Sequence, residues 1–225
     1  MALGTARSKS EEQQRTIDTF HKLFYQAVDW RSELTYFNTP ILKNPLDLFL
    51  LTELVTKLQP DVIIETGTAW GGSALYLAHI LDQIGKGIVV TIDNATSSDK
   101  YIPKVYVWPV HARIKYLIGD SADPYMLQIV KKYIPDDAVV LVILDSDHAY
   151  THVAAEMQAY ATLVTPTSYL IVEDTNTGVV LDGFGPGPAI AVDHFLETQL
   201  GKVFTIDTAL ATKFQFSFNT WLRRL

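Results

Sequence analysis

The segment VIIETGTAWGGSALYLA, residues 62–78, restricts the possible folds of this chain more than any other feature of its sequence. It begins with a β-branched run that is typical of a fully buried strand and ends in a helical pattern. Between them, Gly67, Gly71 and Gly72 allow positive φ angles and close backbone approach, and the new helix offers free N–H groups at its N-terminus. The segment predicts a strand–loop–helix unit that binds a ligand at the carboxyl end of the strand.

Strand and helix patterns alternate along the rest of the chain. Strands are expected at 62–64, 88–92, 115–118, 139–144 and 169–172, and helices at 12–30, 46–58, 72–84, 124–133 and 151–164. This order predicts a mostly parallel sheet with helices on both faces. Two later runs, 203–207 and 214–219, flank the turn candidate Thr212-Lys213 and predict an antiparallel hairpin on the sheet edge.

A chain of 225 residues suits one compact α/β unit. We predict a helical extension at 1–35, acting as a lid or in a homo-oligomer contact, and a main domain at 36–225. The net charge of −7 offers no surface for a phosphate backbone, so nucleic acid is not an expected partner. Cysteine is absent, apolar runs are too short for a membrane span, and the N-terminus has no signal core, so we expect a cytoplasmic protein with no membrane partner.

An acidic residue, Glu65, ends the first strand immediately before the glycines. A phosphate-binding loop would carry a lysine after its glycines and a dinucleotide fingerprint would read G-x-G-x-x-G, and this loop matches neither. A carboxylate here favours a cationic ligand such as S-adenosylmethionine, with its ammonium and sulfonium, although Glu65 could instead cap the helix. The loop and helix-start residues expected at the cofactor are Gly67, Thr68, Gly72 and Ser73.

Acids also follow the next two strands. Asp93 lies at the tip of the strand next to the glycine loop, where an acid is the usual partner of a ribose diol in NAD or S-adenosylmethionine. Asp120, with Ser121 beside it, could accept from an adenine amino group, or both could cap the helix that begins near Pro124. Together with Glu65, they favour a nucleoside-containing cofactor more strongly than any one acid does.

The most apolar strand ends in Asp145, Asp147 and His148, and the following strand ends in Glu173 and Asp174. The ends of neighbouring parallel strands lie side by side, so we expect these groups to converge on the rim of the glycine loop. Clustered carboxylates repel one another unless they are protonated or bridged by a cation, and three oxygen ligands suit Mg²⁺ or Ca²⁺. Helix caps could still explain Asp147 and Asp174 singly.

Two histidines, His148 and His152, stand four residues apart, but Ala149 occupies the glutamate position of the H-E-x-x-H zinc motif. His148 follows Asp145 by three residues, and we predict that it is the catalytic base for a hydroxyl held at the metal. His152 is predicted to be a helix-surface or packed residue.

These motifs and the segment Gly185-Pro186-Gly187-Pro188 resemble the family known as cephalosporin hydroxylase or rhamnosyl O-methyltransferase, from about Thr39 to Leu225. Its relatives include metal-dependent methyltransferases that act on the sugar hydroxyls of macrolide antibiotics. In these, the aspartate of a D-x-x-H segment and a later Glu-Asp pair hold Mg²⁺, and the histidine is the proposed base. The resemblance implies that Asp145, Glu173 and Asp174 are metal ligands, with Asp145 also beside the cofactor, and that His148 is the base.

The resemblance further implies a Rossmann-like class I methyltransferase fold, with a seven-stranded sheet and a final antiparallel hairpin. It predicts an S-adenosylmethionine-dependent, Mg²⁺-dependent O-methyltransferase that acts on a small-molecule hydroxyl, in a sugar or a natural product. Three alternatives remain. An NAD-type oxidoreductase would need a different glycine spacing and a Tyr-x-x-x-Lys pair, an iron oxygenase would need a 2-His-1-carboxylate site, and a non-catalytic cofactor-binding subunit would leave the metal and base residues unexplained.

Overall fold

The computed structural model describes residues 9–27, 33–94, 107–181, 185, 187–213 and 216–225. Its main sheet is built from β3 (Val62–Thr66), β4 (Ile88–Asp93), β5 (Ile114–Ile118), β6 (Val140–Leu144), β7 (Tyr169–Val172), β8 (Phe204–Ile206) and β9 (Thr220–Arg224). The seven strands lie in the order β5-β4-β3-β6-β7-β9-β8. The first five are mutually parallel, and β9 is antiparallel to both β7 and β8. The predicted seven-stranded, mostly parallel sheet is confirmed.

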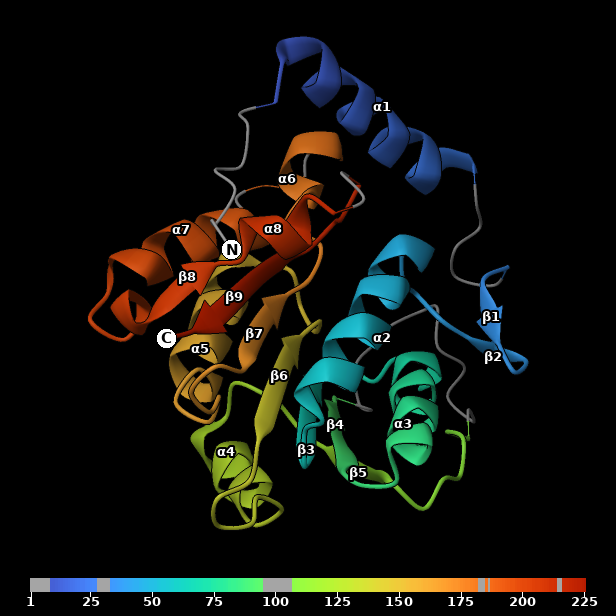
Figure 1. The fold of residues 1–225 in the computed structure, drawn as a ribbon, viewed down its shortest axis with the longest axis vertical. Helices are drawn as coiled ribbons and strands as arrows, with labels where there is room; N and C mark the ends of the chain where they lie inside the picture. Colours follow the sequence, from blue (N-terminus) through green and yellow to red (C-terminus); the bar gives the residue numbers. More distant parts are fainter. Residues whose placement is uncertain (1–8, 28–32, 95–106, 182–184, 186, 214–215) are drawn as a thin grey trace.

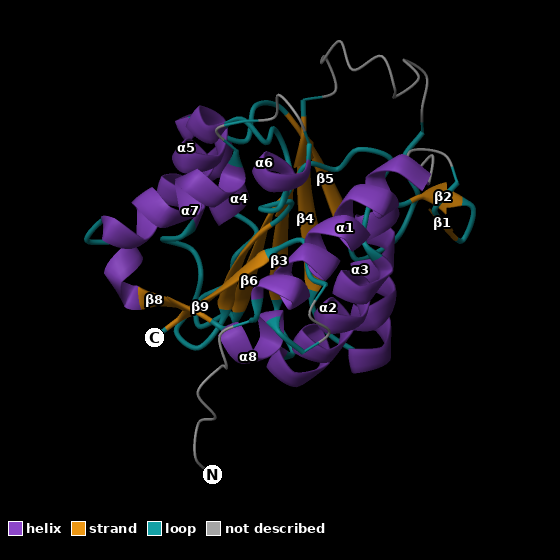
Figure 2. Cartoon of the chain, turned by 90° about the horizontal axis from the view of Figure 1, so that it is seen from above, coloured by secondary structure: helices purple, strands orange, loops and turns teal. Residues whose placement is uncertain are grey.

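Helices cover both faces of this sheet (Figures 1 and 2). On one side lie α2 (Pro45–Leu58) and α3 (Gly72–Ile84), and on the other α4 (Pro124–Lys131), α5 (Tyr150–Tyr160) and α7 (Pro188–Glu197). Successive strand residues point to opposite faces, so each strand contributes to two cores. Leu141 packs in the core with α2 and α3, whereas Val142 packs in the core with α5. Burial on both faces explains why β6 is apolar at every position.

The second strand of the C-terminal hairpin is the main error of the sequence prediction. It is β9 and not 214–219, of which 214 and 215 lie outside the described residues. Trp221 and Leu222 are fully buried in the two opposite cores, which places β9 between β7 and β8. The alternating phenylalanines that indicated a strand have another partner: Phe216 and Phe218 pack against aromatic side chains of the N-terminal helix α1 (Glu11–Ala27).

Several shorter elements complete the fold. They are β1 (Thr35–Tyr36), β2 (Thr39–Pro40), α6 (Thr177–Val180), the 3-10 helix η1 (Gly201–Val203) and α8 (Thr208–Ala211). None of these was predicted, nor was α7, and α8 occupies the chain just before the predicted turn. The predicted helix at 12–30 corresponds to α1, and its last three residues lie outside the described part of the chain, as do residues 1–8 of the predicted extension. α1 lies above α6 (Figure 1). Within the described ranges, no helix has the length and apolar character needed to cross a membrane.

Candidate active site

A cavity of about 720 Å³ lies at the carboxyl ends of the parallel strands. It is centred on the loops after β3 and β6, which are adjacent strands. From β3 the chain continues to β4 and β5 on one side, and from β6 it continues to β7 on the other, so the cavity lies where the strand order reverses. Most of the predicted site residues line it: Gly67, Thr68, Gly72, Ser73, Asp93, Asp120, Ser121, Asp145, His148 and Asp174. The other two predicted residues, Glu65 and Glu173, are buried at 0% and 3% exposure and are not among the lining residues.

Gly67 allows the loop after β3 to touch the end of β6. It has a φ of +88°, and a Cβ at this position would lie 1.8 Å from the carbonyl oxygen of Asp145. At Gly72 the requirement is close packing alone, because a Cβ added there would lie 2.2 Å from the carbonyl oxygen of Pro40. The glycines therefore bring the two cavity-lining loops and the β2 segment into direct backbone contact.

Replacing Gly67 by alanine is expected to destabilise the protein, because the new Cβ adds a backbone clash to a strained φ. We expect a loss of about 2 kcal/mol or more and a fall in Tm of at least roughly 4–8 °C, measured by thermal unfolding. Gly85→Ala is the matched control, since Gly85 has a φ of +85° but open space around its Cβ position. It should cost about 1 kcal/mol. Equal losses in the two variants would show that contact with Asp145 does not determine the choice of glycine.

The buried Glu65 holds the glycine loop through two threonines. The Thr91 hydroxyl donates to Glu65 Oε2 at 2.7 Å, and the Thr68 hydroxyl lies 2.7 Å from that of Thr91. Burial raises the pKa of Glu65 to about 6, although the charge of Lys43 opposes this shift. Among the described residues, its other oxygen, Oε1, has no hydrogen-bond partner. In this structure Glu65 organises the wall of the cavity from behind, and a direct contact with the cofactor stays a prediction.

The two acids at the carboxyl ends of β4 and β5, Asp93 and Asp120, both line the cavity. Asp93 Oδ2 accepts from the N–H of Ala69 at 2.7 Å, which ties the end of β4 to that loop. Asp120 Oδ1 accepts from the backbone N–H two residues later, at 2.8 Å. The alternative that Asp120 or Ser121 caps the next helix is wrong, because Asp123 is the N-cap of α4. Both acids line the cavity, and the N-cap positions of α3 and α4 are held by Gly71 and Asp123.

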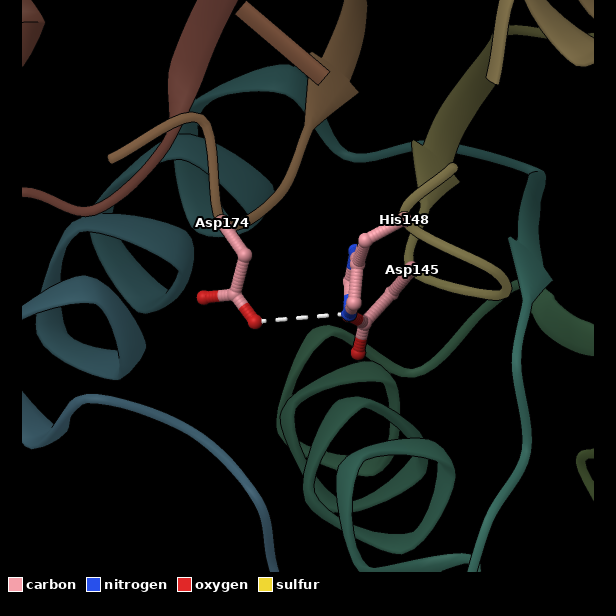
Figure 3. Close-up of side chains that lie close together, drawn as sticks. All are labelled: Asp145, His148 and Asp174. Carbon is pink, nitrogen blue, oxygen red and sulfur yellow. Dashed lines mark ion pairs between the residues drawn. The ribbon is translucent and has the colours of Figure 1, made fainter. Parts of the chain in front are cut away.

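Three polar groups at neighbouring strand ends point toward one another (Figure 3). Asp145 and His148 follow β6, and Asp174 follows β7. His148 Nε2 lies 3.5 Å from Asp174 Oδ2 and 3.9 Å from Asp145 Oδ1. One potential ligand atom from each of the three residues lies within 4.8 Å of the others. This group can hold a divalent cation and can also place a base beside it.

Lys43, between β2 and α2, is a site residue that the sequence analysis missed. Its Nζ lies 2.6 Å from Asp145 Oδ2 and 2.5 Å from Glu173 Oε2, and its side chain is 3% exposed. Burial opposes its charge, but the two carboxylates more than offset that effect and raise the pKa of Lys43. Glu173 thus faces the lysine, and its Oε1 has no hydrogen-bond partner in the part of the chain that the structure describes. The only sequence feature that could have indicated this role is the single lysine within the largely apolar segment TPILKNPLDL.

Tyr25 of α1 is a second residue that was missed. Its hydroxyl donates to Asp174 Oδ1 at 3.2 Å, and its ring stacks on Phe218 with 5.4 Å between the centroids. Burial and the neighbouring Asp174 raise the pKa of Tyr25. Because Tyr25 also lines the cavity, α1 forms part of the wall beside the acidic group. One tyrosine in an amphipathic helix carries no sequence signal for such a role.

Comparison with known proteins identifies the family. A sequence model of the rhamnosyl O-methyltransferase/CmcI family matches residues 28–225. The rhamnosyl O-methyltransferase of Mycobacterium bovis is 34% identical over 200 residues, which cover 88% of this chain and 79% of that protein. The chain belongs to this family. It is an S-adenosylmethionine-dependent O-methyltransferase, as the resemblance implied.

Solved structures agree on the fold. CmcI in complex with Mg and SAM has a TM-score of 0.60 at 18% identity, with 100% of this chain and 88% of that chain covered. MycE, a methyltransferase of the mycinamycin biosynthetic pathway, in complex with Mg and SAH, has a TM-score of 0.54 at 17% identity, with 92% and 54% covered. Together with the strand order, these matches confirm the class I methyltransferase fold.

Proposed function

We propose that this O-methyltransferase acts on a hydroxyl of a small molecule, in a sugar or natural product, and that it uses Mg²⁺ or another divalent cation. The observation that carries the proposal is the convergence of Asp145, His148 and Asp174 at a cavity whose other walls are the glycine loop and Asp93. The relatives support the acceptor class, since one is named for a rhamnosyl group and another belongs to the mycinamycin pathway.

Charge supports the divalent cation. The carboxylates of Asp145, Glu173 and Asp174 carry three negative charges against the one positive charge of Lys43, which leaves −2 when all are ionised. Burial is the main cause that raises the pKa of Asp145 and of Glu173, and Lys43 opposes both shifts without offsetting the effect of burial. Asp145 and Asp174 would hold the ion, and Glu173 has its unpartnered Oε1 to offer as the third predicted ligand.

Each side chain has a distinct part in the proposed reaction. A divalent cation supplies Lewis acidity, which makes an alcohol easier to deprotonate. His148 Nε2 accepts the proton that the acceptor hydroxyl loses as its oxygen takes the methyl group and the carbon–sulfur bond breaks. Asp93 and the glycine loop orient the cofactor, and Tyr25 with Leu181 lines the acceptor side of the cavity. In this proposal α1, which belongs to the predicted extension at 1–35, acts as a lid on the domain formed by 36–225 or takes part in a homo-oligomer contact.

Asp93→Ala is expected to weaken binding of S-adenosylhomocysteine by about 10- to 100-fold, since a hydrogen bond to a charged group contributes about 1.5–3 kcal/mol. Isothermal titration calorimetry measures this directly. Asp61→Ala is the matched control, because Asp61 also accepts from a backbone N–H but lies at the amino end of β3. A wild-type protein that binds NADH and not S-adenosylhomocysteine would contradict the proposed cofactor site.

A further inference from the structure

One stripe of helix α5 holds the loop after β5. His152, Glu156 and Tyr160 are spaced four residues apart and lie on the same side of the helix. All three contact Ser121. His152 Nε2 lies 3.2 Å from Ser121 Oγ, which in turn donates to Glu156 Oε1 at 2.5 Å. The Tyr160 hydroxyl donates to the carbonyl oxygen of Ser121 at 2.9 Å. His152 is therefore neither a free surface residue nor a simple packing residue, and it lines the cavity.

The same glutamate also holds the loop after β6. Ser146, the neighbour of Asp145, donates its hydroxyl to Glu156 Oε1 at 2.7 Å. Glu156 is 0% exposed, and its other oxygen finds no hydrogen-bond partner within the described ranges. His152 Nε2 lies 3.4 Å from Glu156 Oε1, and the hydrogen bond to Glu156 raises the pKa of that histidine. A single buried oxygen thus accepts from two serines on two different loops.

These two loops have different tasks in the proposed function. Ser121 follows Asp120 in the loop predicted to meet the adenine, and Ser146 follows Asp145 in the loop predicted to hold the cation. Both serine hydroxyls donate to the same oxygen, so a displacement of Glu156 Oε1 affects its bonds to both loops. The short distances and full burial make this link stiff, because water cannot replace either bond. The position of each loop consequently depends on the position of the other.

We propose that Glu156 is a positioning residue that couples binding of the cofactor nucleoside to binding of the divalent cation. The inference rests on the proposed function, since both ligands must bind in this cavity. Glu156 does not line the cavity and acts through Ser121 and Ser146. The coupling is reciprocal: Mg²⁺ raises the affinity for S-adenosylhomocysteine by the same factor by which S-adenosylhomocysteine raises the affinity for Mg²⁺.

The test is calorimetric titration of S-adenosylhomocysteine with and without saturating Mg²⁺. In the wild-type protein we expect Mg²⁺ to raise the affinity by about fivefold or more. In Glu156→Leu the two serines lose their shared acceptor, and the effect of Mg²⁺ should fall below about twofold. Glu156→Gln keeps an acceptor oxygen and should retain most of the coupling. Thermal unfolding checks that each variant is folded.

Single-serine variants keep the test decisive if Glu156→Leu does not fold. Ser121→Ala and Ser146→Ala each remove one arm of the link, and each should reduce the coupling about as much as the other. Ser168→Ala is the control, since it removes a buried hydroxyl that has no partner and should leave the coupling unchanged.

The outcomes separate this inference from the proposed function. Wild-type protein that binds both ligands independently, or serine variants that keep full coupling, would overturn the role of Glu156 and leave the cofactor and cation sites standing. Wild-type protein that binds no S-adenosylhomocysteine with or without Mg²⁺ would overturn the proposed function and this inference with it.

Discussion

Asp145→Asn is expected to lower turnover by about 10³-fold, because Lewis-acid activation contributes several kcal/mol and each 1.36 kcal/mol is a factor of ten. Asp145 contributes one of the three ligand atoms that lie within 4.8 Å of one another. It directly follows the buried strand β6, which fixes its backbone, so a neighbouring side chain cannot easily take its place at the cation. Asparagine keeps an oxygen that can accept from Lys43 Nζ, so the variant should remain folded. Binding of Mg²⁺ should weaken strongly, while the affinity for S-adenosylhomocysteine without metal should change little.

Metal titration is the corresponding measurement. EDTA should abolish turnover of the wild-type protein and Mg²⁺ should restore it. Asp147→Asn is the control, because Asp147 lies in the same loop and accepts from a backbone N–H two residues later, at 2.8 Å, but is not one of the three clustered ligand residues found among the described residues. Glu173→Gln then tests the third predicted ligand: weaker Mg²⁺ binding supports ligation, and unchanged binding limits Glu173 to pairing with Lys43. Full activity of Asp145→Asn in EDTA would refute the metal site.

His148→Ala is expected to lower kcat by about 10²- to 10⁴-fold, the usual effect of removing a general base. Affinity for Mg²⁺ and for S-adenosylhomocysteine should stay close to that of the wild-type protein. The reason is geometric: Nε2 lies 3.5 Å from Asp174 Oδ2 at the rim of the cavity, where it can take a proton from a hydroxyl beside the cation. The measurement is kcat across a full Mg²⁺ titration with a working acceptor.

The same geometry defines the competing role. Because Nε2 is also one of the three clustered ligand atoms, His148 could hold the metal and not the proton. In that case His148→Ala would bind Mg²⁺ more weakly, and saturating Mg²⁺ would return kcat to the wild-type value. His194→Ala is the control, since the exposed His194 contacts the Tyr150 hydroxyl. It is preferred to His152→Ala, because His152 contacts Glu156 and takes part in the network that joins the two loops.

Strands and helices could be predicted well wherever local chemistry determines them. Pro45 at the start of α2, the β-branched run of β3 and the tyrosine-to-valine strand β7 each have the boundaries or type expected from their residues. The C-terminal hairpin could not be placed, because 214–219 alternates apolar and polar residues as a half-buried strand does, whereas β9 reads Thr-Trp-Leu-Arg-Arg without such alternation. The tertiary structure shows which segment is the strand: Phe216 and Phe218 pack against aromatic side chains of α1, and β9 pairs with β7 and β8.

The candidate site shows the same division. Sequence alone determined which acids end which strands, and parallel strand ends necessarily meet at one edge of a sheet, so Asp93, Asp120, Asp145 and Asp174 could be placed at one cavity. Sequence could not show the partners that come from distant segments, namely Lys43 between Asp145 and Glu173, and Tyr25 on Asp174. These contacts join residues more than 100 positions apart, and no local pattern records them. The sequence determines which acids lie at the strand ends. The partial neutralisation of those acids depends on the tertiary structure, because only folding brings the buried Lys43 to Asp145 and Glu173.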